Sequence, residues 1–210
     1  MRMKFDIKKT SGYHATKKPQ ILERPGYRCL CINGAGDPNG EDFSVDIQAM
    51  YACAYGLKMG YKKSGIEAND FDDYVVPPLQ GYWTINERAQ KLGTWTKADL
   101  VYRLEIVIPE FVPDAFIQET LAATQTAKAD VERIDQVSIG TIAPAKICHI
   151  LHVGPYDDEQ NSFDTMHAFI NAHGAVRTSK THREIYLSDA QRTAPEKLKT
   201  ILEVTIAEEA

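Results

Sequence analysis

The chain has 210 residues, of which 43% are apolar and 25% are charged, and its formal net charge is −5. This balance is typical of a globular protein and excludes a disordered or fibrous chain. The negative charge gives no general attraction to nucleic acid or to an anionic membrane. The first residues lack the apolar run of a signal peptide, and no stretch has the length of a membrane span. We therefore expect a cytoplasmic protein with no nucleic-acid or membrane partner.

The cysteines and histidines do not predict a metal site. The four cysteines lie in apolar segments without a CxxC pair, so we interpret them as small core residues. His149 and His152 are three apart in a predicted strand, which places them on opposite faces. His167 and His173 are six apart on a predicted helix and also diverge. Since GxSxG and HExxH motifs are absent too, we expect neither a metal nor a cofactor.

The first half of the chain begins with an arm, residues 1–19, that holds five lysines and few large apolar side chains. Residues 27–32 form a mostly apolar run, which favours a buried strand. Turn residues fill positions 33–40. The apolar residues between 43 and 57 then follow helical spacing, and Gly60 is the expected end of that helix.

Two extended segments complete this half, which spans residues 20–108. Residues 74–85 predict a strand interrupted by two prolines, which cannot donate to a sheet. Residues 101–108 alternate between apolar and polar side chains, as a strand does when its two faces differ. A second amphipathic helix, within residues 109–139, links this half to the next.

The second half, residues 140–210, repeats the order of the first. An apolar run at 145–152 precedes a helical pattern, and alternating segments follow at 183–188 and 201–206. We therefore predict an α+β fold in a single domain. It consists of two β-α-β-β units with antiparallel sheets, helices on one side and a ligand cleft between the halves.

Several aromatic residues and one acid stand out as candidates for a small-molecule pocket. Tyr82 and Trp83 share a predicted strand, and Trp95 follows twelve residues beyond Trp83. Tyr156 follows a Gly-Pro turn in the second half. A tryptophan is more often a core residue than part of a binding site, so the pattern alone leaves both roles open.

Glu184 and Tyr186 share one face of the strand at 183–188. Ile185 and Leu187 alternate with them, and we expect these two apolar residues to pack against the helices. Glu184 and Tyr186 would then point to the other face of the sheet and form the wall of the cleft. A glutamate on a strand is usually solvated, which is the competing interpretation.

These segments resemble the GyrI-like small-molecule-binding domain. Its second half is similar to residues 153–156 with the helix that follows them and then residues 183–189. Residues 77–83 resemble the Pro-Leu-Glu-Gly-x-Trp segment of its stand-alone bacterial members. The resemblance extends roughly from Lys4 to the end of the chain. It implies a duplicated unit around a ligand pocket, in which Glu184 faces the ligand among aromatic rings.

The chain departs from the family pattern at two positions. Gln80 stands where many relatives carry glutamate, which removes one charge from the expected pocket, and Thr84 stands where a second tryptophan is common. The chain also has no helix-turn-helix or basic recognition segment. It does not resemble the transcription regulators of the family.

The resemblance implies two functions that the sequence does not separate. One is sequestration of hydrophobic, aromatic xenobiotics, cationic or electrophilic, and the other is hydrolysis of strained cyclopropane-bearing alkylators. In the second case Glu184 would activate a water and Tyr156 would donate a hydrogen bond. A third hypothesis is a protein inhibitor of a topoisomerase. The expected ligand-binding residues are Trp83, Tyr82, Trp95, Tyr186 and Gln80.

Overall fold

A computed structural model describes residues 3–66 and 71–209. The fold is α+β, and its main sheet has nine strands that all pair in antiparallel fashion. In spatial order the strands are β2 (Gln20–Arg24), β8 (Ala145–Val153), β11 (Lys199–Glu208), β10 (His182–Tyr186), β5 (Leu79–Ile85), β6 (Leu100–Ile108), β3 (Tyr27–Ala35) and β7 (Ser138–Ile142), with β9 (Ala175–Arg177) beside β11. A separate pair, β1 (Met3–Phe5) and β4 (Phe71–Tyr74), is parallel.

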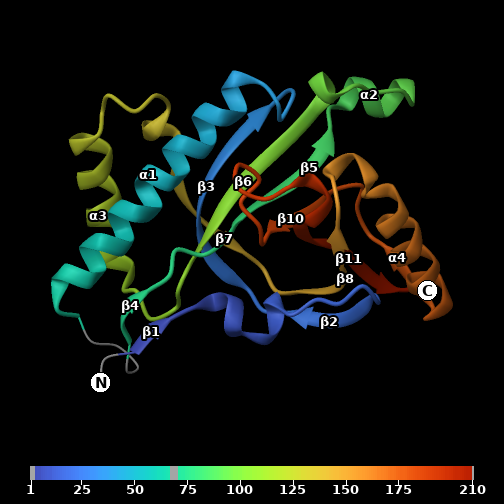
Figure 1. The fold of residues 1–210 in the computed structure, drawn as a ribbon, viewed down its shortest axis with the longest axis horizontal. Helices are drawn as coiled ribbons and strands as arrows, with labels where there is room; N and C mark the ends of the chain where they lie inside the picture. The colour runs from blue at the N-terminus through green and yellow to red at the C-terminus, as the bar shows by residue number, and fades with distance from the viewer. Residues whose placement is uncertain (1–2, 67–70, 210) are drawn as a thin grey trace.

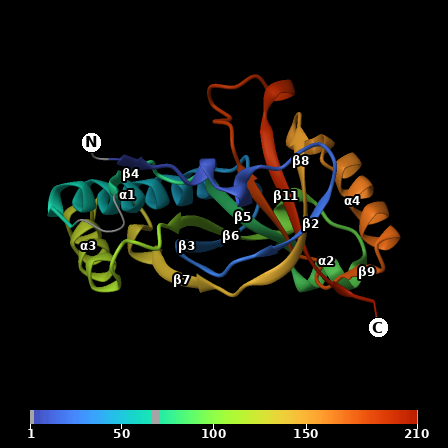
Figure 2. The same ribbon diagram turned by 90° about the horizontal axis from the view of Figure 1, so that it is seen from below.

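The described residues form four α-helices: α1 (Glu41–Ser64), α2 (Glu87–Leu92), α3 (Asp114–Ala127) and α4 (Gln160–Ala172). Figures 1 and 2 place α1 and α3 together toward one end of the sheet and α4 toward the other end. None of the helices in the described ranges is both long and apolar enough to span a bilayer.

The order of the main strands is symmetric about the pair β5–β10. Read outward from this pair, β5, β6, β3 and β7 match β10, β11, β8 and β2. This is the arrangement that a duplicated β-α-β-β unit gives. The short strands β2 and β7 each pair with the first long strand of the opposite half, and the sequence pattern does not predict them. Each spans five residues, too few for a clear alternation.

Helices α1 and α4 cover the same face of the sheet, as the sequence predicted. Trp83 of β5 and His182 of β10 are cross-strand partners, so their side chains share a face. The Trp83 ring packs against Phe43 of α1, while the His182 ring packs edge-on against Phe163 of α4. The centre of the sheet therefore faces a region between the two helices, which we call the helix face.

Helix α1 runs four residues past Gly60, where the sequence predicted its end. It stops at Gly65, which has a φ of 70° that suits glycine. Gly60 lies instead where α1 crosses α3, and a Cβ there would be 3.0 Å from the Thr120 side chain. The glycine thus serves close helix packing rather than helix termination.

The opposite, helix-free face holds a buried polar network. Arg183 is 4% exposed and donates to Glu203 at 2.8 Å and to Gln80 at 2.6 Å. Glu105 is fully buried and accepts from Tyr27 at 2.9 Å, and Gln80 also approaches it at 3.3 Å. The network therefore links β5 and β6 of one half to β10 and β11 of the other.

The N-terminal arm is not a simple surface appendage, as the lysine-rich sequence suggested. Its β1 pairs with β4, and the Thr16 carbonyl accepts a hydrogen bond from the amide of Leu151 in β8. Tyr13 reaches the buried network, and burial raises its pKa to about 12 despite the opposing effect of Arg183. The arm thus covers part of the helix-free face.

We predict that Arg183→Met lowers the free energy of unfolding by about 2 kcal/mol or more, because the buried Glu203 carboxylate keeps only Arg24 as a cationic partner and Gln80 loses its donor. The measurement is urea unfolding followed by circular dichroism. Arg192→Met is the matched control, since Arg192 forms an exposed pair with Asp189. That control should change stability by less than about 0.5 kcal/mol. Equal effects of the two substitutions would show that the buried network is not stabilising.

Candidate functional site

A chain of hydrogen bonds crosses the centre of the helix face. The indole Nε1 of Trp83 donates to the Tyr186 hydroxyl at 2.8 Å, and that hydroxyl donates to Glu184 Oε2 at 2.8 Å. The other carboxylate oxygen, Oε1, lies 2.8 Å from Nε2 of His182. Both oxygens of Glu184 are therefore held, and its carboxylate has a fixed orientation.

Glu184 and Tyr186 lie on the helix face, opposite to the face that the sequence predicted. The alternation itself is correct, but Ile185 points to the helix-free face, beside Arg183, and its cross-strand partner there is Gln80. Both faces of β10 are buried, so an isoleucine finds an apolar environment on either of them. The apolar residues of this strand consequently do not identify its helix face.

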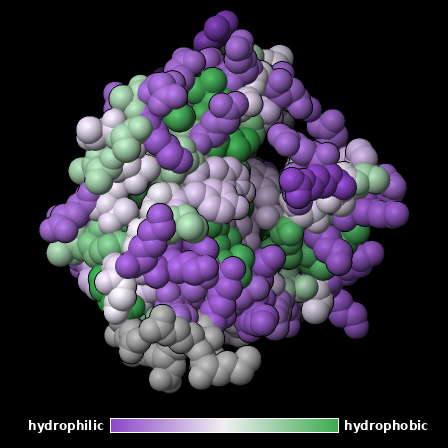
Figure 3. Space-filling model, turned by 60° about the vertical axis from the view of Figure 1, so that its left-hand side comes forward, coloured by the Kyte–Doolittle hydropathy of each residue, from purple (hydrophilic) through white to green (hydrophobic). Residues whose placement is uncertain are grey.

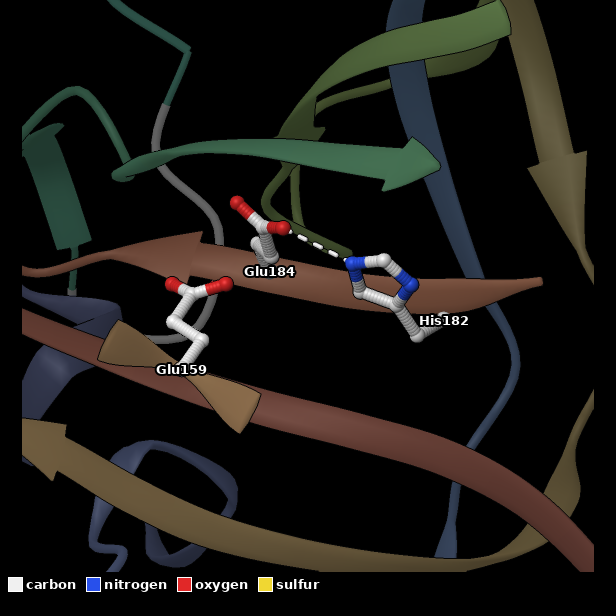
Figure 4. Close-up of side chains that lie close together, drawn as sticks. All are labelled: Glu159, His182 and Glu184. Carbon is white, nitrogen blue, oxygen red and sulfur yellow. Dashed lines mark hydrogen bonds and ion pairs between the residues drawn. The ribbon is translucent and has the colours of Figure 1, made fainter. Parts of the chain in front are cut away.

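Glu159 completes an acidic cluster that the sequence pattern does not predict. It caps α4 directly after a short 3₁₀ turn, is 8% exposed, and its Oε1 has no hydrogen-bond partner among the described residues. One ligand atom from each of Glu159, His182 and Glu184 lies within 4.8 Å of the others. Figure 4 shows the Glu159 carboxylate directed toward Glu184. The only sequence signals were an acidic run before a helix and a His-x-Glu pair on a strand.

The cluster alters the protonation of its neighbours. Burial, and then the adjacent Glu184 carboxylate, raise the pKa of Glu159 well above its ordinary value. Burial likewise raises the pKa of Tyr156 to about 12 and that of Tyr186 well above its ordinary value, with Glu184 adding to both shifts. At neutral pH both tyrosines keep their hydroxyl protons, and the environment of Glu159 favours its protonated form.

Aromatic rings surround the cluster. Tyr156 packs edge-on against Tyr186 with ring centroids 5.8 Å apart, and Trp83 packs against Phe43 and Tyr102. The structure thus brings together four of the residues that the sequence singled out. They are Glu184, Tyr156, Trp83 and Tyr186.

The other three residues expected in the pocket lie elsewhere. Tyr82 and Gln80 alternate with Trp83 along β5 and point to the helix-free face, where Gln80 accepts from Arg183. The glutamine at this position therefore does not change the charge around Glu184. Trp95 lies in the loop after α2 and is 56% exposed, so it is not part of the buried cluster.

The cluster is closed in this conformation. Glu184 is 8% exposed, Trp83 is 5% exposed, and the ring of Tyr156 is the most accessible member at 40%. An open groove of about 410 Å³ lies between α1 and α3, but Trp83 does not line it. The face drawn in Figure 3 is mostly hydrophilic, with apolar residues in small separate patches. Trp83 thus packs as a core residue while its indole N–H contributes to the site.

Comparison with known proteins gives independent information on this arrangement. No curated protein matches the chain. An uncharacterized conserved protein from Listeria innocua has a structure with 30% sequence identity and a TM-score of 0.83, covering 97% of this chain and all of that one. A hydrolase from Listeria innocua has 28% identity and a TM-score of 0.81, with the same coverage. The EcmrR C-terminal domain shares the fold at 10% identity and a TM-score of 0.53, covering 91% of this chain and 98% of that domain.

The match to a family model covers most of the chain. Residues 17–207 match the model of the GyrI-like small molecule binding domain. The matched range includes all of the main sheet except the last residue of β11, together with α1 to α4 and every residue of the cluster around Glu184. The chain belongs to the family of GyrI-like small-molecule-binding domains.

Proposed function

We propose that this protein binds hydrophobic aromatic small molecules, cationic or electrophilic, at Glu184, and hydrolyses those that carry a strained cyclopropane. One observation carries the proposal: a single carboxylate, held by His182 and Tyr186, stands within a wall of aromatic rings. A hydrolase from Listeria innocua with 28% identity over nearly the whole chain supports the catalytic part.

Binding requires the closed cluster to open, and Tyr156 is the residue suited to move. It is the most exposed ring of the wall and follows Gly154, whose φ of 145° suits only glycine, and Pro155. A planar ligand that displaces this ring would stack on Tyr186 and approach Glu184. A cationic ligand would gain a charge pair and cation–π contacts of about 0.5–2 kcal/mol each.

Hydrolysis of a cyclopropane conjugated to a carbonyl adds one water across a strained bond. Glu184 removes a proton from water, and the resulting hydroxyl forms a bond to the ring carbon. The strained carbon–carbon bond breaks, and its electron pair moves to the conjugated carbonyl oxygen. The protonated carboxyl of Glu159 donates a proton to that oxygen, with Tyr156 as a further hydrogen-bond donor. Proton transfer from Glu184 to Glu159 then restores the starting state.

The test of catalysis is Glu184→Gln, which keeps the shape of the side chain and removes its charge. We expect the turnover of a spirocyclopropyl-cyclohexadienone to fall about 10²–10⁴-fold, since general-base catalysis contributes that much. The water adduct is measured by mass spectrometry. Glu196→Gln, at an exposed site in the same half, should leave turnover unchanged. Unaltered turnover in Glu184→Gln would refute the assignment of the base.

The test of binding compares phenyltrimethylammonium with its neutral isostere, tert-butylbenzene. We expect the wild-type protein to prefer the cation, and Glu184→Gln to lose most of that preference while still binding the neutral ring. Isothermal titration calorimetry measures both affinities. Binding without any turnover of the cyclopropane substrate would favour sequestration. A cation preference that survives the substitution would place the cationic site elsewhere.

A third test follows the proton on Glu159 through the pH dependence of protein stability. A chelator is present so that no metal ion binds the carboxyl group. Its raised pKa means that unfolding releases a proton once the pH exceeds the ordinary glutamic acid pKa of about 4.3. The wild-type protein therefore loses stability as pH rises above that value, whereas Glu159→Gln has no proton to release. We expect the variant to be more stable at pH 8 by about 1 kcal/mol or more, and this advantage to shrink toward pH 4. A stability difference between the two proteins that stays constant from pH 4 to pH 8 would contradict the raised pKa of Glu159.

A further inference from the structure

The helix face contains three side chains that together resemble a set of metal ligands. His182 and Glu184 are two positions apart on β10, so both side chains project from the same face of the strand. Glu159 reaches them from the start of α4. We propose that Glu159, His182 and Glu184 bind a divalent transition-metal ion of the zinc class. This inference goes beyond the proposed function and does not depend on it.

The geometry of the three side chains suits such an ion. Zinc binds imidazole nitrogen and carboxylate oxygen at about 2.0–2.2 Å, which places tetrahedral donor atoms roughly 3.4 Å apart. One donor atom from each residue lies within 4.8 Å of the others, and Nε2 of His182 is 2.8 Å from Oε1 of Glu184. Side-chain rotations that move the donor atoms by about 1 Å would bring all three within bonding distance of one ion. One nitrogen and two oxygen ligands favour zinc over magnesium, which prefers oxygen alone.

A second observation supports a ligand at this position. Glu159 is 8% exposed, and its Oε1 is buried without a hydrogen-bond partner among the described residues. Buried polar atoms are nearly always satisfied, so this oxygen has unused capacity for a partner within the cluster. A bound cation would displace the proton from Glu159, provide that partner and neutralise the two adjacent carboxylates.

The surrounding residues fix the proposed ligands as outer-shell residues do in known metal sites. The Tyr186 hydroxyl holds Oε2 of Glu184, which leaves Oε1 free to face His182. The ring of Phe163 packs edge-on against His182 with centroids 4.8 Å apart and restricts its rotation. Two of the three ligands are therefore already oriented. A metal ion at this position would compete with an organic cation for Glu184.

The experiment uses the full chain, freshly reduced and freed of metal, titrated with zinc chloride in a calorimeter. We expect one ion per chain, and we expect Glu159→Gln and His182→Asn each to weaken binding at least tenfold. His173→Asn is the matched control, because His173 is an exposed histidine on the same helix as Glu159, and its affinity should equal that of the wild type. Circular dichroism confirms that each variant is folded.

Cobalt(II) serves as a second, spectroscopic probe. Oxygen and nitrogen ligands alone should give visible d–d bands without the intense ultraviolet band of a cobalt–thiolate bond. The proposal is overturned by such a thiolate band, by zinc affinity weaker than millimolar, or by unchanged affinity in both ligand variants. Each of these results leaves the proposed function intact, because the roles proposed there for Glu184 and Tyr156 need no metal ion.

Discussion

The pairing of β5 with β10 at the centre of the sheet is the constraint on which the two faces depend. Arg183 points to the helix-free face, where Glu203 and Gln80 hold it, and Glu184 must therefore point to the helix face. A slip of one residue in this register would exchange the two side chains. It would leave an unpaired arginine beneath the helices and remove the carboxylate from the aromatic wall. The buried ion pair thus fixes the position of the site as well as the join between the halves.

The two faces of the same strands differ in how their buried carboxyl groups are paired. On the helix-free face, Glu105 has three partners, since Tyr27 and Gln80 donate to it and Arg103 lies 2.7 Å from its other oxygen. On the helix face, the carboxyl of Glu159 keeps an unsatisfied oxygen beside Glu184. Carboxylates that pair with arginines are neutralised within the protein, whereas carboxyl groups that have no arginine partner among the described residues retain capacity for a cationic ligand or a proton. This difference, rather than the number of aromatic residues, distinguishes the candidate site from the core.

Much of the fold follows from sequence patterns, because the long strands and three of the helices have clear periodicities. The sequence does not show which face of β10 lies against the helices, because both faces are buried and Ile185 is accommodated on the helix-free side. Alternation identifies which residues share a face but not which face is covered by helices. Alternation also places Gln80 and Tyr82 on the face opposite to Trp83, so these two residues do not join the cluster that contains Trp83. The position of Glu159 depends on how α4 meets the sheet, and this contact has no signature in the local sequence.

The symmetric fold carries an asymmetric site, and the strand register explains why. Glu105 pairs with Gln80 in the first half and Glu203 pairs with Arg183 in the second, which makes Gly81 the counterpart of Glu184. Gly81 also lies directly across from Glu184. A Cβ at Gly81 would lie 2.7 Å from the indole nitrogen of Trp83 and 3.3 Å from the Tyr186 hydroxyl. The chain of hydrogen bonds that orients Glu184 therefore occupies the space that a second side chain would need. The two similar halves form the sheet, and the absence of a side chain at Gly81, where the halves meet, leaves room for a single oriented carboxylate.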